Sequence, residues 1–262
     1  MKIARFVARG VEQYGIVDGE RVQATRGLPW ESLEKTGTEY ALAEVKLLAP
    51  VQPPDVIAIG LNYKLHADES GMPYPAAPVI FLKATSAVVG PGDAIVLPEM
   101  APSAVDYEAE LAIVIGRSCR KVSAEAALDY VLGYTCGNDV SARDCQLKLD
   151  AQWARGKSFD TFCPLGPWIE TDLDPDQAPI RLELNGETMQ ESNTSDLIFS
   201  CRTLVSYCSH MATLRPGTVI MTGTPSGVGM ARTPPRYLQP SDHVSVTIEG
   251  IGTLSNYVRA DE

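Results

Sequence analysis

The segment Val105–Ile115 carries two glutamates that are spaced for joint chemistry. Glu108 and Glu110 lie two positions apart at the start of an apolar run that is typical of a β-strand, so both side chains point to the same face. Two carboxylates side by side repel each other and raise each other's pKa unless a cation lies between them. Asp106 extends the same predicted face. Taken alone, this pattern indicates either a cation site or a solvated strand end.

A third carboxylate, Asp139, favours the cation site. The segment Gly133–Asp144 is typical of a short strand that opens into a polar turn. Asp139 lies among small residues at the end of that strand, where a ligand or a metal can approach. Together with Glu108 and Glu110 it would form an all-oxygen site. Such a site suits Mg²⁺ or Mn²⁺, which leave positions open for water and substrate, whereas Ca²⁺ usually takes more ligands.

His66 and Glu69 form a second pair. They are separated by three positions, so they share a face if this segment is helical. Gly71, Pro73 and Pro75 follow, as expected for a mobile cover over a site rather than a rigid element. By itself, an H-x-x-E spacing is more often part of a solvent-facing helical turn, so the pair needs further support.

Two parts of the chain differ in pattern, and their boundary is expected near Pro50. In residues 1–50, short apolar segments such as Ile3–Val7 and Tyr14–Val17 alternate with turn signals. This alternation predicts a small, strand-rich N-terminal domain. Residues 51–262 would then form the larger, catalytic domain.

The larger part is rich in predicted strands. Short β-branched runs occur at Val56–Ile59, Val79–Leu82, Leu111–Ile115 and Val219–Met221, as in buried strands. The Asn185-Gly186 pair predicts a tight hairpin turn.

Helices are fewer in the prediction. Ser123 is expected to cap one that runs through Leu128. The longest is expected to begin near Ser195 and to carry a core-facing stripe. His210 on this helix and His243, ahead of an edge-like strand, are interpreted as structural.

The composition is that of a soluble globular protein and excludes several classes of function. The chain has 262 residues and a net charge of −11, and an acidic surface repels the phosphates of nucleic acids. No apolar run is long enough to cross a bilayer and no secretory signal is expected. The protein is therefore predicted to be cytoplasmic, with no membrane or nucleic-acid partner. Six cysteines without a C-x-x-C spacing argue against a zinc ribbon or a redox motif.

Six short segments, taken in order, make the sequence resemble the fumarylacetoacetate hydrolase family. They are Gly60–His66, Pro78–Lys83, Tyr107–Ala112, Asn138–Asp144, Gly156–Asp160 and Met221–Gly229. Each segment is weak alone, but the ordered set is highly specific and covers most of the chain. The resemblance implies a mostly β (α+β) fold, in which a mixed β-sheet is rolled into a barrel-like structure and a small N-terminal domain precedes it. It also implies a homodimer.

The resemblance further implies roles for the site residues. It assigns the metal ligands to the three carboxylates that the residue pattern had already grouped. His66 would be the general base that prepares a water molecule, with Glu69 as its orienting partner, and Lys157 would supply a fixed positive charge. The residues expected to contact the substrate or the cover are Lys83, Arg143, Gln146 and Thr224.

The expected activity is C–C bond cleavage in a small 2-keto acid, dependent on Mg²⁺ or Mn²⁺ and passing through a metal-stabilised enolate. Hydrolysis of an acylpyruvate or another 2,4-diketo acid needs an activated water, so the His66–Glu69 pair favours this reaction. Oxaloacetate decarboxylation needs no water. Isomerisation or hydration of 2-hydroxy-dienoic acids is the alternative within the family. A non-catalytic scaffold on the same fold is the alternative of another class, and a failure to bind either metal would favour it.

Overall fold

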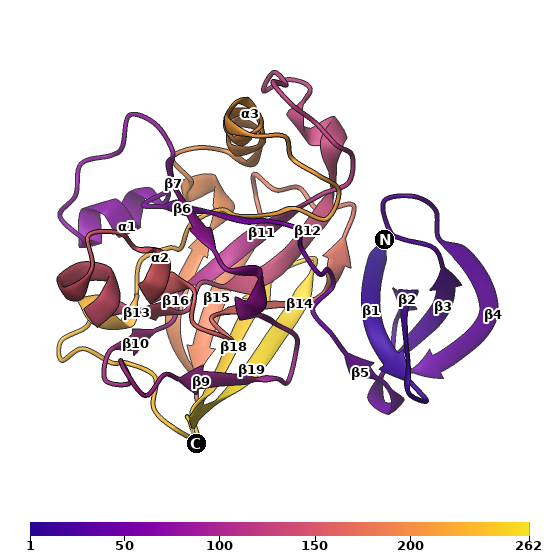
Figure 1. Ribbon diagram of the computed structural model, residues 1–262, viewed down its shortest axis with the longest axis horizontal. Helices are drawn as coiled ribbons and strands as arrows, with labels where there is room; N and C mark the ends of the chain where they lie inside the picture. The colour runs from indigo at the N-terminus through magenta and orange to yellow at the C-terminus, as the bar shows by residue number, and fades with distance from the viewer. Residues whose placement is uncertain (262) are drawn as a thin grey trace.

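The computed structural model describes residues 1–261 of the chain. Strands hold 42% of the protein and helices 17%, so the predicted mostly β fold class is confirmed. A small unit at the N-terminus lies to one side of a larger body, which is built from sheets and flanked by short helices (Figure 1). Within the described residues, no helix has the length and apolar character that crossing a bilayer requires.

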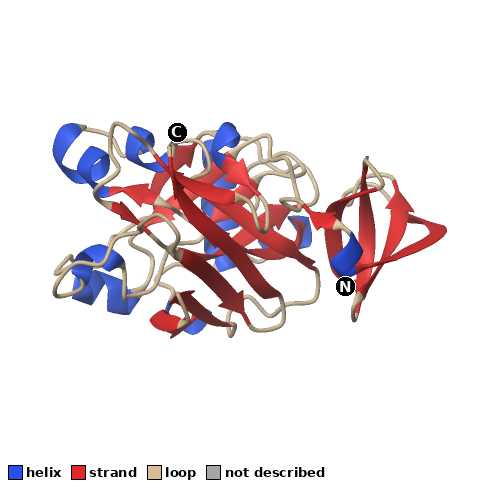
Figure 2. Cartoon of the chain, turned by 90° about the horizontal axis from the view of Figure 1, so that it is seen from below, coloured by secondary structure: helices blue, strands red, loops and turns tan. Residues whose placement is uncertain are grey.

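Residues 1–50 form an antiparallel unit with a small core of its own. Its strands are β1 (Lys2–Ala8), β2 (Val11–Asp18), β3 (Arg21–Arg26), β4 (Glu34–Ala41) and the short β5 (Lys46–Leu47). Phe6 and Val22 are fully buried in this core. β1 also pairs with β14 (Cys163–Glu170), so the unit continues the main sheet instead of being joined by a linker alone. Figure 2 shows this unit beside the larger body.

The main sheet contains 12 strands and carries the acidic residues of interest. After β14, its order is β12 (Val131–Asn138), β11 (Ala109–Ile115), β17 (Val219–Met221), β6 (Val56–Gly60) and β7 (Val79–Lys83), with β8 (Val88–Val89) beside β14. β17 and β6 are parallel while β11 and β12 are antiparallel, so the sheet is mixed. Every residue of β11 is buried, Glu110 included; the apolar run Leu111–Ile115 is typical of such a strand.

A five-stranded sheet packs against the main sheet. Its order is β16 (Glu187–Asn193), β15 (Pro179–Leu184), β18 (His243–Ile248), β19 (Gly252–Ala260) and β9 (Ala94–Leu97), and a separate pair joins β10 (Val105–Asp106) to β13 (Ser141–Ala142). The predicted Asn185-Gly186 turn joins β15 to β16 with both residues at positive φ. β18 lies between β15 and β19, so the prediction that His243 precedes an edge-like strand is wrong.

The helices are shorter than the sequence predicts. They are α1 (Lys64–Glu69), α2 (Ala154–Lys157) and α3 (Cys201–Met211). α3 begins after Ser200, not near Ser195. The backbone N–H groups of Ile198 and Phe199 donate to the backbone and side-chain oxygens of Asn62. These tertiary bonds keep the preceding stretch out of the helix and outweigh its helical spacing.

The helix predicted to start at Ser123 is also wrong. The segment contains only a 3₁₀ turn at Ala127–Tyr130. Arg117 donates two N–H bonds to the carbonyl of Asp129, and β12 begins directly at Val131. Bonds from residues 116 and 117 thus use the carbonyls of Asp129 and Tyr130 outside a helix.

Candidate active site

Three buried carboxylates meet at one end of the β11–β12 pair. Glu108 immediately precedes β11, Glu110 lies within it, and Asp139 directly follows β12. The strands are antiparallel, with Glu110 opposite Gly137, so the start of one strand lies beside the end of the other. One ligand atom from each of the three residues lies within 4.8 Å of the other two. The structure therefore brings together the three residues that the sequence grouped.

Three cationic side chains contact two of these carboxylates. Lys157 Nζ lies 2.7 Å from Glu108 Oε2 and 2.7 Å from Asp139 Oδ2. Arg143 Nη1 lies 2.7 Å from Glu108 Oε1, and Lys83 Nζ lies 2.5 Å from Asp139 Oδ1. All five residues are buried, so water screens these charges little. Glu108 and Asp139 thus have two cationic partners each.

Within residues 1–261, no lysine or arginine side chain forms an ion pair with Glu110. Its carboxylate accepts the backbone N–H of Gly223 at 2.8 Å. Burial, with the negative charges of Asp139 and Glu108, raises the pKa of Glu110 well above its ordinary value. Burial would also raise the pKa of Glu108, but the neighbouring cations, Lys157 first, outweigh it and hold that pKa well below its ordinary value.

This arrangement fits a divalent cation. Glu108, Glu110 and Asp139 offer hard carboxylate oxygens, the ligands that Mg²⁺ and Mn²⁺ prefer. Burial and the neighbouring carboxylates both raise the pKa of Glu110, and a cation beside it would offset the repulsion between the carboxylates. These three residues would hold the ion, and the lysine and arginine side chains that contact Glu108 and Asp139 would orient those two carboxylates.

The predicted pair on α1 forms, and it is also attached to a loop. His66 Nδ1 lies 3.0 Å from Glu69 Oε2, as the i,i+3 spacing on a helix allows. The other oxygen of Glu69 accepts the backbone N–H of Gly227 at 2.8 Å. Because a carboxylate only accepts, we assign the proton of neutral His66 to Nδ1, which leaves Nε2 as the proton acceptor.

Gly227 is required at that position for two reasons. Its φ of 100° is in the region that favours glycine. In addition, a Cβ there would clash with the carbonyl oxygen of Met189. The loop Met221–Gly229 can therefore approach both α1 and β16 closely.

Arg143, Gln146 and Thr224 line the same cavity as the carboxylates. Gln146 Oε1 accepts from Arg143 Nη1 at 2.8 Å. Thr224 Oγ1 accepts from Gln190 Nε2 at 2.8 Å. Gln190, which is buried and also accepts the N–H of Ala109, was not predicted. In the sequence it is only one polar residue of a hairpin, and its contacts depend on how the two sheets pack.

Lys83, at the end of β7, lies behind the carboxylates instead of lining the cavity. Its ammonium is buried and donates to Asp139 and to the backbone oxygens of Val140 and Lys157. This position suits a residue that orients Asp139; the expectation from the sequence was contact with the substrate or the cover.

The cavity at this site has a volume of about 260 Å³. This is below the roughly 300–1,000 Å³ that is usual for drug-sized ligands, so the cavity suits a small molecule. Its polar lining consists mainly of the three carboxylates and the side chains of His66, Arg143, Gln146, Lys157 and Thr224. Apolar side chains make up much of the rest, namely Met72, Phe81, Leu147, Trp153 and Met230.

Asp106 does not join the carboxylate group, contrary to the prediction from strand alternation. The alternation is interrupted, because β10 ends at Asp106 and β11 begins only at Ala109. Asp106 instead accepts the N–H groups of Gly229 at 2.8 Å and Met230 at 3.0 Å, and it pairs with Arg143 Nη2 at 2.8 Å. It is therefore an anchor for the loop and for Arg143.

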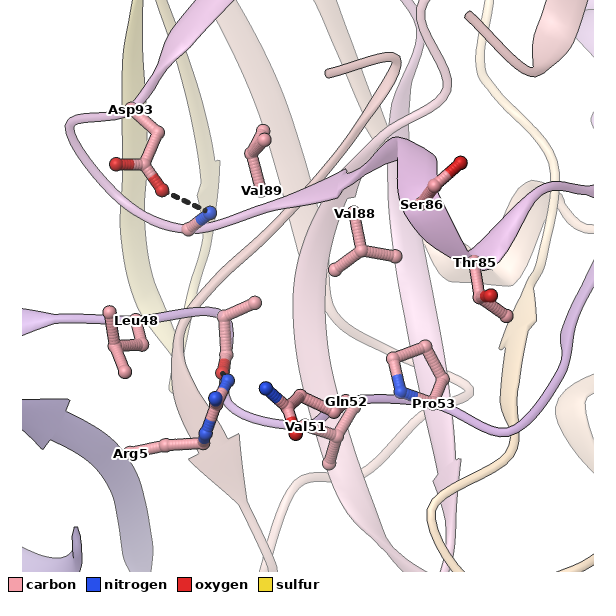
Figure 3. Close-up of a pocket in the computed structure, with 12 residues that line it drawn as sticks. Arg5, Leu48, Val51, Gln52, Pro53, Thr85, Ser86, Val88, Val89 and Asp93 are labelled. Atoms are coloured by element: carbon pink, nitrogen blue, oxygen red, sulfur yellow. Dashed lines mark hydrogen bonds between the residues drawn. The ribbon is translucent and has the colours of Figure 1, made fainter. Parts of the chain in front are cut away.

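A second cavity, of about 460 Å³, lies where the N-terminal unit meets the larger part of the chain (Figure 3). Its charged groups are already paired. Arg5 contacts Glu12 at 2.8 Å, and Asp93 accepts the N–H of Gly90 at 2.9 Å and contacts Lys46 at 3.0 Å. In the described part of the chain, the group of side chains with metal-ligand spacing lies elsewhere. The smaller cavity is therefore the candidate active site.

Two consecutive segments of the chain each match a known protein family. Residues 1–50 match the family described as Rv2993c-like, N-terminal, and residues 55–259 match the family described as fumarylacetoacetate (FAA) hydrolase C-terminal. The chain is 46% identical to a mitochondrial oxaloacetate tautomerase of Xenopus laevis, over 82% of this chain and 69% of that protein.

Solved structures agree. A 2-hydroxyhepta-2,4-diene-1,7-dioate isomerase from Mycobacterium marinum has a TM-score of 0.90 and 44% identity, covering 100% of this chain and 99% of that one. A fumarylacetoacetate hydrolase from Exiguobacterium antarcticum has a TM-score of 0.91 and 38% identity, covering 100% of both chains. The chain therefore belongs to the fumarylacetoacetate hydrolase family.

Proposed function

We propose that the protein is a divalent-metal-dependent enzyme that converts small 2-keto acids by way of an enolate. The observation that carries this proposal is that one small cavity is lined both by three buried carboxylates and by His66, which is paired with Glu69 at 3.0 Å. Mg²⁺ or Mn²⁺, when bound, would polarise the keto acid as a Lewis acid and stabilise its negative charge.

The protein's own residues would supply charge and proton transfer. Lys157 is buried, which would lower its pKa, but Asp139 and Glu108 outweigh this effect and raise it. Lys157 therefore keeps its positive charge beside the developing negative charge. His66 would move a proton through Nε2, while Glu69 fixes the orientation of the ring.

Two kinds of reaction follow from the same enolate. Proton transfer, as tautomerisation or isomerisation, is the first in our proposal, since relatives at 46% and 44% identity are named oxaloacetate tautomerase and dioate isomerase. Cleavage of a C–C bond is the second, and the His66–Glu69 pair supports it, because the same base could take a proton from water in a 2,4-diketo acid hydrolase. Oxaloacetate decarboxylation would need the enolate but no water.

The test measures both reactions with one protein preparation. Deuterium exchange at C3 of 2-keto acids, followed by NMR, reports enolisation, and coupled pyruvate detection reports cleavage of acylpyruvates and oxaloacetate. Each is measured with Mg²⁺, with Mn²⁺, with chelator, and in His66→Ala. We expect metal-dependent exchange that His66→Ala reduces about 10²- to 10⁴-fold. Neither exchange nor pyruvate release with any metal would refute the proposal and favour the non-catalytic scaffold.

We also propose that the protein is a homodimer, as the family resemblance implies. β7 is the last strand in the order of the main sheet, and its residues Val79 and Leu82 are 37% and 56% exposed. Exposed apolar side chains on an edge strand favour burial against another chain. Light scattering after size exclusion should give twice the mass of 28.3 kDa; a monomer would contradict the proposal.

A further inference from the structure

The wall of the cavity beyond the charged groups is aromatic. Phe81 lies directly beside the polar end, since its ring centroid is 5.1 Å from Lys157 Nζ. Its ring then meets that of Trp153 edge to face, with 5.7 Å between the centroids. Gly60 provides the space for this indole, because a Cβ there would lie 2.6 Å from Trp153 Cζ3. The wall is thus apolar from Lys157 outward.

Two further apolar side chains line the cavity while remaining open to water. Met72, in the segment after α1, is 54% exposed, and Leu147, in the π-helix Cys145–Leu149, is 52% exposed. A single exposed apolar side chain is ordinary, but several around one opening are typical of a surface that a ligand covers. A substrate that extends along this wall would bury them.

The cations of the cavity are already engaged by carboxylates of the protein. Lys157 contacts Glu108 and Asp139, and Arg143 contacts Asp106 and Glu108. No other lysine or arginine lines the cavity in the part of the chain that the structure describes. A second carboxylate that extended along the apolar wall would therefore have no lysine or arginine as a counter-charge, which is costly.

We infer that the substrate is a 2-keto monocarboxylic acid with an apolar tail, and that Leu147, Phe81 and Trp153 select for that tail. This inference rests on the proposed function, and it concerns the part of the substrate that extends away from the carboxylates. It separates this protein from the relatives named above, because oxaloacetate and a 1,7-dioate both carry two carboxylates. The reaction would be shared with these relatives and the substrate would differ.

The experiment compares 2-keto acids of matched length that differ only at the far end. Metal-dependent exchange at C3 is measured for pyruvate, 2-ketobutyrate, 2-ketopentanoate and 2-ketohexanoate, and for the dicarboxylates oxaloacetate, 2-ketoglutarate and 2-ketoadipate. Each buried methylene should raise kcat/KM by about fourfold. 2-Ketohexanoate should exceed 2-ketoadipate by at least about tenfold, because the second carboxylate is desolvated without a partner.

A charge placed on the wall provides the second arm. Leu147→Lys should lower kcat/KM for 2-ketohexanoate and raise it for 2-ketoadipate. Leu149→Lys is the matched control, since Leu149 lies in the same π-helix, is 65% exposed and does not line the cavity. This control should leave both values unchanged. Equal responses of the two variants would overturn the role of Leu147.

The outcomes distinguish the inference from the proposed function. Exchange that is as fast with 2-ketoadipate as with 2-ketohexanoate would overturn the inference and leave the proposed function intact. No exchange with any acid, together with no pyruvate release from acylpyruvates or oxaloacetate, would refute the proposed function. In that case the affinities of the same two acids, measured by calorimetry with Mn²⁺ present, decide the inference: tighter binding of 2-ketohexanoate supports it, and equal or weaker binding overturns it.

Discussion

The variant Glu69→Gln tests whether the carboxylate of Glu69 orients His66, the proposed proton acceptor. The two carboxylate oxygens of Glu69 accept one N–H each, from His66 Nδ1 and from the backbone of Gly227. A glutamine of the same shape has only one oxygen. Its NH₂ group must therefore face one of the two positions. At Gly227 it meets an N–H donor, so the loop loses its partner; at His66 it donates to Nδ1, which moves the ring proton to Nε2 and removes the proton acceptor.

The size of the effect follows from the type of bond that is lost. A hydrogen bond to a charged group contributes about 1.5–3 kcal/mol, or about 10- to 150-fold in rate if it acts in the transition state. The side chains of His66 and Glu69 are 12% and 23% exposed, so partial screening favours the lower part of this range. We expect kcat for C3 exchange to fall about 10- to 50-fold, with little change in KM.

The control is Asp68→Asn on the same helix. Asp68 is exposed and accepts a bond from Tyr74, so the variant removes one negative charge from α1 without touching His66. Both variants are assayed by NMR at saturating Mg²⁺, and thermal unfolding verifies that they fold. If Glu69→Gln and Asp68→Asn retain equal activity, Glu69 does not orient the base and the assignment of His66 must be abandoned.

Three further outcomes are expected. Glu110→Gln should weaken Mn²⁺ binding, measured by calorimetry, by at least about tenfold, because even the loss of a residue that only supports a metal ligand has an effect of this size. An unchanged affinity would show that Glu110 is not a metal ligand. Asp106→Asn should lower the free energy of unfolding in urea by about 3 kcal/mol, because Arg143 loses a buried partner, and an unchanged midpoint would contradict this. Burial opposes ionisation of Asp242, but bonds from Arg236 and other donors outweigh it and lower its pKa. The ionised carboxylate therefore stabilises the fold above its ordinary pKa of 3.8 and loses this effect as pH falls through the lower folded value. Asp242→Asn should thus be destabilising at neutral pH and nearly neutral well below pH 3.8, as urea unfolding across pH would measure.

Strand periodicity was sufficient to group the carboxylates. Glu108 and Glu110 could be paired because they begin a strand that is buried throughout. Asp139 could be added because a second apolar strand ends there. The same rule was wrong for Asp106, because it assumes an unbroken strand. The break depends on the pairing of β10 with β13, which involves residues distant in the sequence.

Features that depend on packing between distant elements could not be predicted. Gln190 reaches Thr224 only because the five-stranded sheet packs against the main one. The late start of α3 depends on hydrogen bonds from residues 198 and 199 to Asn62. The apolar wall likewise combines β7, with Phe81, and the residue before α2, Trp153. No periodicity within a single segment contains this information.

The carboxylate site depends on the register in which β11 pairs with β12. Glu110 lies opposite Gly137, and a slip of one residue would turn its side chain to the other face of the sheet. A chain paired in the wrong register could not gather the three carboxylates. A divalent ion would bind the native pairing alone and stabilise it by about 2.7 kcal/mol at a concentration 100 times Kd. The metal content of a preparation would thus report the fraction of molecules in which β11 and β12 pair in the correct register.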